Sequence, residues 1–329
     1  MAFKQFLRTL VVTFSLAAVS LVSALGQTVA DDFETTQTSA EQGRIESQLK
    51  LGRMYELGSG VKKNFRQAVF WYTKASQSSP EAKARLAAML LFGRGIDKST
   101  AQAEQLLREA ATNDNPVAET YLGYMYENGL GIAKDLREAY RWYVKAGSGG
   151  YSRAQDQVGL MYRHGTGVPK NQAEALKWFY WAAQQGDSQA KVHIGESFYF
   201  GLAAPKDRAT ALKWFRDAAN TGNPVAQYSI GHMYEVGEAV PQDYAEAVKW
   251  YMLSAEQDHP PAQSALCALY DTGLGVTQDN VVAYKWCGLS ARRDFRPAKD
   301  RQASLKTRMT KSQIDASEKK IAEFLAEDH

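Results

Sequence analysis

The stretch AETYLGYMYENGLGIAKDLREAYRWY, residues 118–143, decides the fold. From Leu122 to Tyr126 it places apolar and small residues at helical spacing, which predicts one face of a helix. Gly129 then supplies the left-handed conformation in which many helices end. Asp135 is a preferred residue for starting a helix, because its carboxylate accepts from free backbone N–H groups. The stretch therefore predicts two helices joined by a turn, here named helix A and helix B.

The same pattern recurs along the chain in seven repeats, with a step of 35 residues once and 36 residues five times. Four columns define it. Glycine ends every helix A, at Gly58, Gly93, Gly129, Gly165, Gly201, Gly237 and Gly273. Helix A carries a column of small residues, Gly52, Ala87, Gly123, Gly159, Gly195, Gly231 and Cys267. Helix B carries an alanine column, Ala68, Ala103, Ala139, Ala175, Ala211, Ala247 and Ala283. It also carries a tryptophan column, Trp71, Trp142, Trp178, Trp214, Trp250 and Trp286, with Leu106 in the second repeat. A lone hairpin would expose its aromatic column, so the hairpins must stack into a solenoid, and we interpret the tryptophan column as core.

Good capping residues precede every helix B, namely Asn64, Ser99, Asp135, Asn171, Asp207, Asp243 and Asp279. Three residues further on, five repeats carry side chains that could complete a capping box: Gln67, Gln102, Glu138, Glu174 and Glu246. Asn115-Pro116 and Asn223-Pro224 are typical of the start of a helix A. We assign residues 41–291 to the seven repeats.

Residues 292–329 are predicted to form C-terminal capping helices. Thr310 to Gln313 has the pattern of a capping box. An apolar stripe follows it, formed by Ile314, Ile321, Phe324 and Leu325. Such a stripe suits a helix that covers the end of the array.

The first 26 residues have the features of a signal peptide. Lys4 and Arg8 give a positive start, a short apolar stretch follows, and Ala24 and Gly26 have the spacing that a signal peptidase reads. A second candidate cleavage point follows Ala30. The apolar stretch contains hydroxyl residues and is shorter than the ~18 residues that a spanning helix needs, which favours cleavage over a membrane anchor. We expect an exported protein, periplasmic or secreted, without stable membrane insertion after cleavage, and a flexible polar segment over residues 27–40.

The repeat pattern resembles the Sel1-like repeat family, a relative of the tetratricopeptide repeats. The likeness covers about residues 44–291 and is closest in residues 118–143 and 154–179. The second repeat departs from it at Leu106, and the fifth has Ala203 in place of the second turn glycine. The resemblance implies an all-α, right-handed α/α superhelix that acts as a protein-binding adaptor, and it brings no shared catalytic residues.

Composition and motifs argue against several other functions. The chain has 39 Lys and Arg against 36 Asp and Glu, without the basic excess that nucleic acid binding demands. The five histidines have no His or Cys partner at ligand spacing, so we expect neither a metal nor a cofactor. The name β-lactamase has been given to some disulfide-rich members of the family. Ser47, Ser59 and Ser317 each precede a lysine by three residues, but the accompanying S-D-N and K-T-G elements are absent.

We therefore expect a scaffold or adaptor for a protein or peptide, in cell-envelope assembly or signalling, and not an enzyme. A regulator that sequesters a membrane sensor is the alternative, and a β-lactamase-like hydrolase is a weaker one. If helix A lines a concave groove, residues one, four and five places after the small column face a partner. They are Arg53, Glu56, Tyr124, Glu127, Asn128, Arg163, His164, Tyr199, His232, Glu235 and Asp271.

Cys267 and Cys287 are the only cysteines in the chain, and we expect them to form a disulfide. Disulfides persist in exported proteins, and the two antiparallel helices of one hairpin could bring these residues together. Two buried free thiols are the alternative, because the bond requires a Cα separation below about 7 Å.

Overall fold

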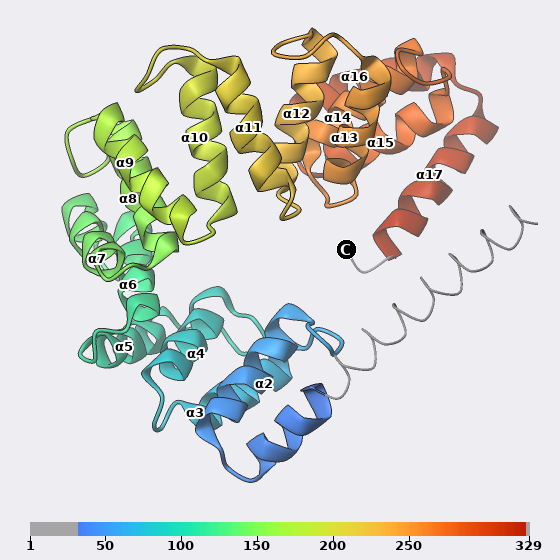
Figure 1. Ribbon diagram of the computed structural model, residues 1–329. Coiled ribbons are helices and arrows are strands. Elements are labelled where there is room, and N and C mark those ends of the chain that lie inside the picture. The colour runs from blue at the N-terminus through green and yellow to red at the C-terminus, as the bar shows by residue number, and fades with distance from the viewer. Residues whose placement is uncertain (1–31, 327–329) are drawn as a thin grey trace, which may run out of the picture. The chain divides into compact units, whose positions relative to one another are not determined.

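The computed structural model describes residues 32–326, which are helical apart from the connecting turns (Figure 1). The helices are α2 (Ile45–Leu57), α3 (Phe65–Ala75), α4 (Pro80–Phe92), α5 (Thr100–Ala111), α6 (Pro116–Asn128), α7 (Leu136–Ser148), α8 (Ser152–His164), α9 (Gln172–Gln184), α10 (Ser188–Phe200), α11 (Arg208–Ala219), α12 (Pro224–Val236), α13 (Tyr244–Ala255), α14 (Pro260–Thr272), α15 (Asn280–Arg292), α16 (Arg296–Arg308) and α17 (Lys311–Ala326).

The helices pair into seven hairpins, from α2 with α3 to α14 with α15. Even-numbered helices of this set are helix A and odd-numbered ones are helix B. Each hairpin also packs on the next within the two compact units of the chain, Met1–Ala154 and Gln155–His329. The predicted all-helical repeat solenoid is confirmed.

The predicted turn residues shape the hairpins as expected. The glycine that ends each helix A has a φ between 68° and 77°, in the left-handed region. Every predicted cap of helix B accepts a hydrogen bond from a backbone N–H of the first turn. Asn115 and Asn223 cap α6 and α12 ahead of their prolines, as predicted. Local sequence thus fixes where these helices begin and end.

Three of the residues predicted to close capping boxes bind elsewhere. The carboxylates of Glu138, Glu174 and Glu246 pair with a basic residue one turn further along the same helix. A cation at that distance offers a carboxylate a stronger partner than the backbone does. Thr310 and Gln313 do form the predicted capping box, since each side chain accepts from the other's backbone N–H.

The core of each hairpin lies where helix B crosses the small column of helix A. A Cβ atom placed on Gly52, Gly123, Gly159, Gly195 or Gly231 would lie within 2.8 Å of the aromatic ring that follows the tryptophan column. These rings belong to Tyr72, Tyr143, Phe179, Phe215 and Tyr251. Glycine is required there because the ring occupies the space that a side chain would need.

The tryptophan column is less buried than we expected from its regularity. Trp71 and Trp286 are buried, but the tryptophans of the third to sixth repeats are only partly so. The fully buried rings stand one position later, at Tyr72, Tyr143, Phe179 and Tyr251. A large indole beside the hairpin axis spans from the core to the surface, whereas the next residue points straight at the facing helix.

The C-terminal helices cover the seventh hairpin. Phe324 of α17 meets Trp286 edge to face, with ring centroids 5.8 Å apart, and Ile321 lies over Gly288. The Ser317 hydroxyl donates to the Val281 carbonyl. Leu325 was predicted to join this apolar stripe but is 49% exposed, because it lies beside Phe324 on the outer side of α17.

The prediction for residues 27–40 was wrong over the part that the structure describes. Residues 32–41 form a helix instead of a flexible segment. Phe33 meets Tyr55 edge to face at 5.8 Å, and Thr36 and Ala40 are buried. Few apolar side chains suffice here because α2 provides a surface to cover. Residues 27–31 and the predicted signal peptide of residues 1–26 lie outside the described residues.

Candidate functional site

Every residue predicted to face a partner lies on a helix A, but the structure gives many of them internal roles. Glu56, Glu127 and Glu235 each accept a hydrogen bond from the tyrosine hydroxyl under the small column. Burial, reinforced by the carboxylate, raises the pKa of those tyrosines, which keeps the hydroxyls protonated. These three glutamates therefore help to hold their own hairpins together.

Arg163 is buried and joins the fourth repeat to the fifth. It is 9% exposed, and its guanidinium lies 4.6 Å from the centre of the Phe179 ring. It donates to the His193 carbonyl at 2.7 Å and to Glu196 at 2.6 Å. The prediction that its side chain points into an open groove is wrong, because α10 covers it.

Next to these contacts of Arg163, His193 Nδ1 lies 2.7 Å from the Asp156 carboxylate, and both side chains are buried. The pair joins α10 to α8, as Arg163 does. Asp271 has a similar structural role, since it forms ion pairs with Arg301 and Arg308 of α16. It was predicted to face a partner, but the C-terminal cap occupies its carboxylate.

The remaining predicted residues are more accessible. Arg53, Asn128 and His164 are exposed, and Tyr124 is partly buried against Phe92, with ring centroids 5.7 Å apart. They lie on α2, α6 and α8 and are not gathered around one cavity. Within residues 32–326, Tyr199 and His232 of the predicted set line a common pocket.

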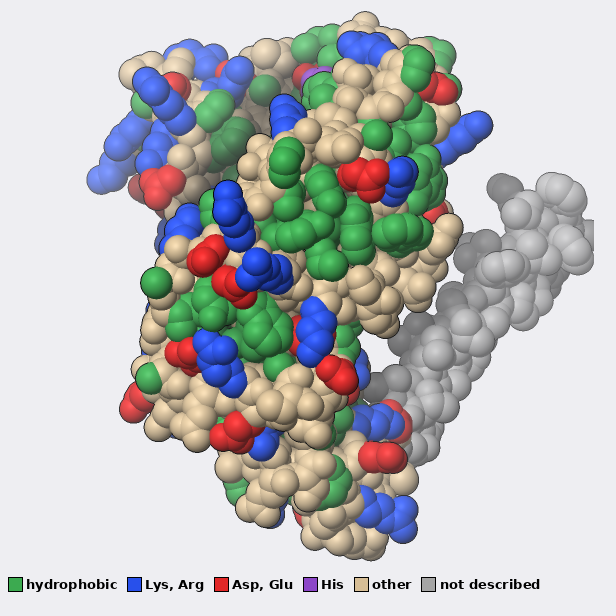
Figure 2. All heavy atoms as spheres, turned by 90° about the vertical axis from the view of Figure 1, so that its left-hand side faces the viewer, with side chains coloured by type: hydrophobic (Ala, Val, Ile, Leu, Met, Phe, Trp, Pro, Cys, Tyr) green, Lys and Arg blue, Asp and Glu red, His purple; other side chains and the backbone are tan. Residues whose placement is uncertain are grey.

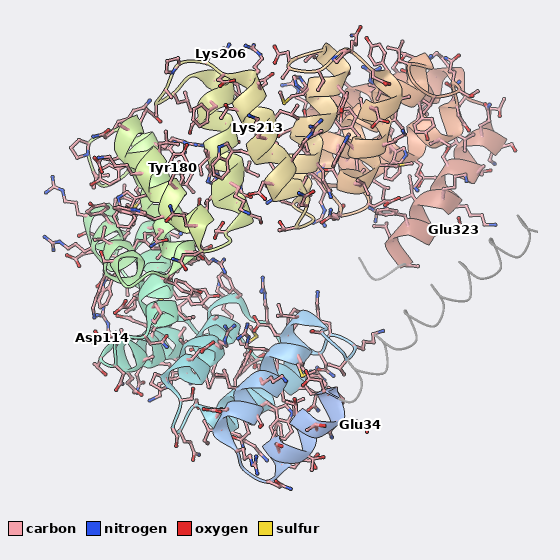
Figure 3. The ribbon with its side chains drawn as sticks, in the orientation of Figure 1. Glu34, Asp114, Tyr180, Lys206, Lys213 and Glu323 are labelled. Atoms are coloured by element: carbon pink, nitrogen blue, oxygen red, sulfur yellow. A yellow bond between two sulfur atoms is a disulfide. The ribbon has the colours of Figure 1, made fainter. Side chains whose placement is uncertain are left out.

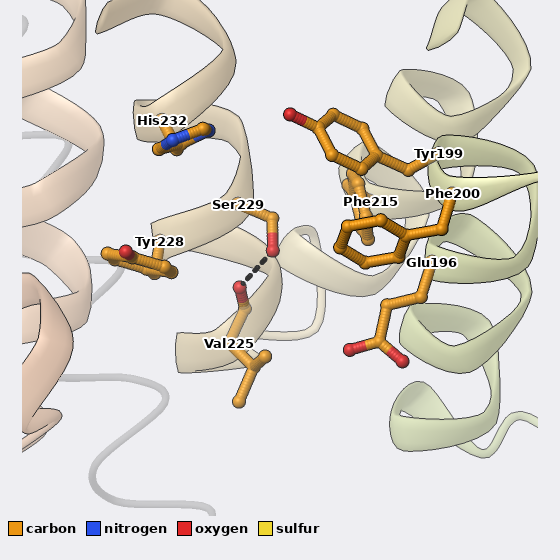
Figure 4. Close-up of a pocket in the computed structure, with 8 residues that line it drawn as sticks. All are labelled: Glu196, Tyr199, Phe200, Phe215, Val225, Tyr228, Ser229 and His232. Atoms are coloured by element: carbon orange, nitrogen blue, oxygen red, sulfur yellow. Dashed lines mark hydrogen bonds between the residues drawn. The ribbon is translucent and has the colours of Figure 1, made fainter. Parts of the chain in front are cut away.

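That pocket lies between α10 and α12, the A helices of the fifth and sixth repeats, and is here named the A-helix pocket. Its volume is about 370 Å³. Figure 4 shows Tyr199, Phe200 and Glu196 on one side and Tyr228 and His232 on the other. Phe215, Val225 and Ser229 complete its lining. Rings predominate, and Phe200 is 60% exposed, so the pocket presents apolar surface to solvent.

Polar contacts fix the walls of the A-helix pocket. The Tyr199 ring carries the Arg208 guanidinium 5.3 Å from its centre, and Arg208 forms a 2.7 Å ion pair with Glu238. The Arg208 guanidinium and the Tyr199 hydroxyl beside Glu238 hold the pKa of its carboxyl at about 2, while burial and the Glu238 contact raise the pKa of Tyr199 to about 12. Burial also raises the pKa of Tyr228. The hydroxyls of Tyr199 and Tyr228 therefore stay protonated at ordinary pH.

Sequence reasoning missed six of the eight residues that line the A-helix pocket. Glu196 and Phe200 occupy the first and fifth places after the small column, so the rule that selected Tyr199 could have found them. Tyr228, Ser229 and Val225 precede the small column of the next repeat, and Phe215 belongs to helix B. The pattern of a single repeat does not reveal a site that two repeats build.

Cys267 and Cys287 are joined by a disulfide, with a Cα separation of 5.2 Å. Both are fully buried. They occupy the two positions, 20 residues apart, that hold Gly231 and Tyr251 in the sixth repeat. The bond thus links α14 to α15 where other repeats place a ring against a glycine.

A second aromatic surface lies on helix B. Trp181 is 47% exposed and meets Trp178 edge to face at 4.8 Å, and Tyr180 meets Trp214 at 5.5 Å. Figure 2 shows apolar side chains at the surface with acidic and basic ones scattered between them. This helix-B surface lacks a comparable pocket among those found in the described residues, so we treat it as the reference for the A-helix pocket.

Two further findings concern residues 32–326. In that range, His, Cys, Asp and Glu side chains form no cluster of three or more with a geometry for holding a metal ion. None of the helices described has both the length and the apolar character needed to cross a bilayer.

Comparison with known proteins gives a consistent result. The family model described as Sel1 repeat matches seven consecutive segments, at residues 45–79, 80–115, 116–151, 152–187, 188–223, 224–259 and 260–295. No curated protein matches the sequence significantly.

Among solved structures, the chain is similar to a protective antigen present in uropathogenic Escherichia coli strains that displays an SLR fold. Identity is 30% over 92% of this chain and 68% of the antigen, with a TM-score of 0.68. A Sel1 repeat protein from Oxalobacter formigenes is also 30% identical, over 85% of this chain and 81% of its own, with a TM-score of 0.61. An immunity protein from Pseudomonas aeruginosa, 20% identical with a TM-score of 0.51, shares the fold.

Proposed function

Because the chain belongs to the Sel1 repeat family, whose members generally serve as protein-interaction scaffolds, we propose that it is a non-enzymatic adaptor that binds a partner protein at the A-helix pocket. The observation that carries the proposal is the pocket itself. Its rings come from two repeats, and one of them, Phe200, is 60% exposed, as expected of a side chain that can contact a partner. Aromatic side chains in a recess are typical anchors of protein interfaces.

We further propose that the adaptor works outside the cytoplasm, after removal of residues 1–26 or 1–30. The positive start, the short apolar stretch and the Ala24 and Gly26 spacing support export. The buried disulfide supports it as well, because such bonds persist in oxidising compartments. The test is expression of the full-length chain, followed by fractionation and mass measurement. A cytoplasmic protein with an intact N-terminus would contradict export.

Partner capture from an envelope extract tests the binding site. The pocket variant combines Phe200→Ala with His232→Ala. The matched control combines Glu174→Lys with Lys213→Glu on helix B, two residues that do not line the pocket; Figure 3 labels Lys213 on α11. We expect the pocket variant to lose at least about tenfold of the captured partner, as for interface anchors, and the control to retain it.

The opposite pattern, with capture kept by the pocket variant and lost by the control, would assign binding to helix B. Identification of the captured partner as an integral membrane sensor would favour the sequestering regulator over a scaffold for assembly. Both variants should unfold at the same temperature as the parent, which separates a lost contact from a lost fold.

A further inference from the structure

The lining of the A-helix pocket combines rings with one carboxylate. Four aromatic rings and one imidazole surround it, from Tyr199, Phe200, Phe215, Tyr228 and His232. In Figure 4, the Glu196 side chain extends beside Phe200 toward the space between α10 and α12. The faces of aromatic rings attract cations, and arginine is found over them more often than lysine. The lining contains no lysine or arginine of its own.

Glu196 is held in place by Arg163 of α8. Its Oε2 atom accepts from Arg163 at 2.6 Å, and Arg163 is itself fixed by the His193 carbonyl and the Phe179 ring. The Glu196 side chain remains 31% exposed. A carboxylate has about four acceptor sites, so one bond to Arg163 leaves acceptor capacity on the solvent side. The carboxylate is thus oriented in advance for a second donor.

The same helices already bind guanidinium groups with a ring and a carboxylate. Arg163 lies on Phe179 and pairs with Glu196, and Arg208 lies on Tyr199 and pairs with Glu238. Both arrangements use a helix-A carboxylate or one just beyond helix A, with a ring 4.6 Å or 5.3 Å from the guanidinium carbon. Glu196 and Tyr199, which belong to these two arrangements, also line the A-helix pocket. There they lie beside Phe200, which is 60% exposed to solvent.

We propose that the A-helix pocket receives an arginine side chain of the bound protein. This inference rests on the proposed function and names the chemistry of its anchor. The planar guanidinium stacks against the rings while its N–H groups donate to Glu196, a combination that lysine cannot match. The volume of about 370 Å³ accommodates such a side chain and leaves room for an apolar neighbour.

The experiment titrates the purified protein, produced from the full-length sequence, with blocked tripeptides. Acetyl-Ala-Arg-Ala-amide is compared with the same peptides carrying Gln or Glu at the centre, and with choline. Amide chemical shifts in nuclear magnetic resonance spectra report the site. We expect the arginine peptide to shift the signals of Phe200, Ser229 and His232, with at least about tenfold higher affinity than the glutamine peptide.

Variants test the assigned contacts. Glu196→Gln keeps an acceptor for Arg163 but removes the charge, and we expect about tenfold weaker binding of the arginine peptide. Phe200→Ala should weaken binding severalfold, and Glu174→Gln on helix B should leave it unchanged. Equal binding of the arginine and glutamine peptides would overturn the proposal. Choline binding at the same residues without arginine binding would also overturn it, in favour of a small quaternary ammonium ligand.

The outcomes separate this inference from the function on which it rests. If partner capture depends on Phe200 and His232 while the arginine peptide does not bind, the pocket binds the partner through other chemistry and the inference fails alone. If the arginine peptide binds the pocket while capture survives the pocket variant, the proposed function fails and the cation preference stands.

Discussion

The sixth and seventh repeats hold their helix A and helix B together in different ways. In the sixth, Gly231 lies against the Tyr251 ring, whose hydroxyl donates to Glu235. In the seventh, a disulfide joins the two corresponding positions, and Asp271, in the place of Glu235, binds arginines of α16 instead. The role of the residue four places after the small column therefore depends on which side chain of helix B lies next to it.

This dependence extends to the other repeats. Where the ring is a tyrosine, as at Tyr72 and Tyr143, a glutamate accepts a hydrogen bond from its hydroxyl. Where it is Phe179, an arginine lies on the ring face. Variation from repeat to repeat in this column thus reflects how each hairpin closes. It is no evidence by itself for contact with a partner.

The largest effect is expected from emptying the ring position of the sixth repeat. Tyr251→Ala should lower the free energy of unfolding by about 3–5 kcal/mol, because it leaves a cavity against Gly231 and removes the donor to Glu235. Trp181→Ala, at an exposed ring on helix B, should cost less than about 1 kcal/mol. Urea unfolding measures both. Similar losses would mean that the ring under the small column does not hold the hairpin.

Exchanging the disulfide of the seventh repeat for the glycine and tyrosine of the sixth tests whether the two are equivalent. Removing the disulfide with Cys267→Ala and Cys287→Ala should cost about 3 kcal/mol, since the bond restricts the unfolded chain. Cys267→Gly with Cys287→Tyr rebuilds the closure of the sixth repeat and should recover about 1 kcal/mol or more of that loss through ring burial. A Gly–Tyr variant less stable than the Ala–Ala variant would show that the two closures are not interchangeable.

The smallest effect is expected from the hydroxyl alone. Tyr251→Phe should cost about 1 kcal/mol at neutral pH, the net value of one hydrogen bond. Burial and Glu235 raise the pKa of folded Tyr251 above its ordinary value of 10.0. Above pH 10 the unfolded tyrosine releases a proton that the folded one keeps, so stability falls as the pH rises. The variant should show a shallower fall between pH 10 and 11; equal slopes would contradict the raised pKa.

Much of the fold could be predicted from the sequence because its determinants are local. A turn glycine such as Gly129 and a cap such as Asp135 act within a few residues, and seven copies repeat the signal. The ring that follows the tryptophan in five repeats was overlooked, because only the space available on the facing helix distinguishes Tyr143 from Trp142.

The candidate site was predicted less well for a related reason. The rule that selects residues one, four and five places after the small column describes which way side chains point from a single helix. It does not tell that α10 covers Arg163, that α16 binds Asp271, or that Tyr228 and Phe200 face a common space. Those facts depend on how neighbouring repeats pack, and only two of the eight pocket residues were anticipated.

Site-specific photocrosslinking shows in the cell whether the partner binds at the A-helix pocket. A benzoylphenylalanine is placed at Phe200 in the pocket or at Trp181 on helix B, both of which are exposed. The protein is then irradiated in the cell that makes it. We expect a crosslinked partner from position 200 and none from position 181. A crosslink from position 181 alone would contradict it and place the partner on helix B.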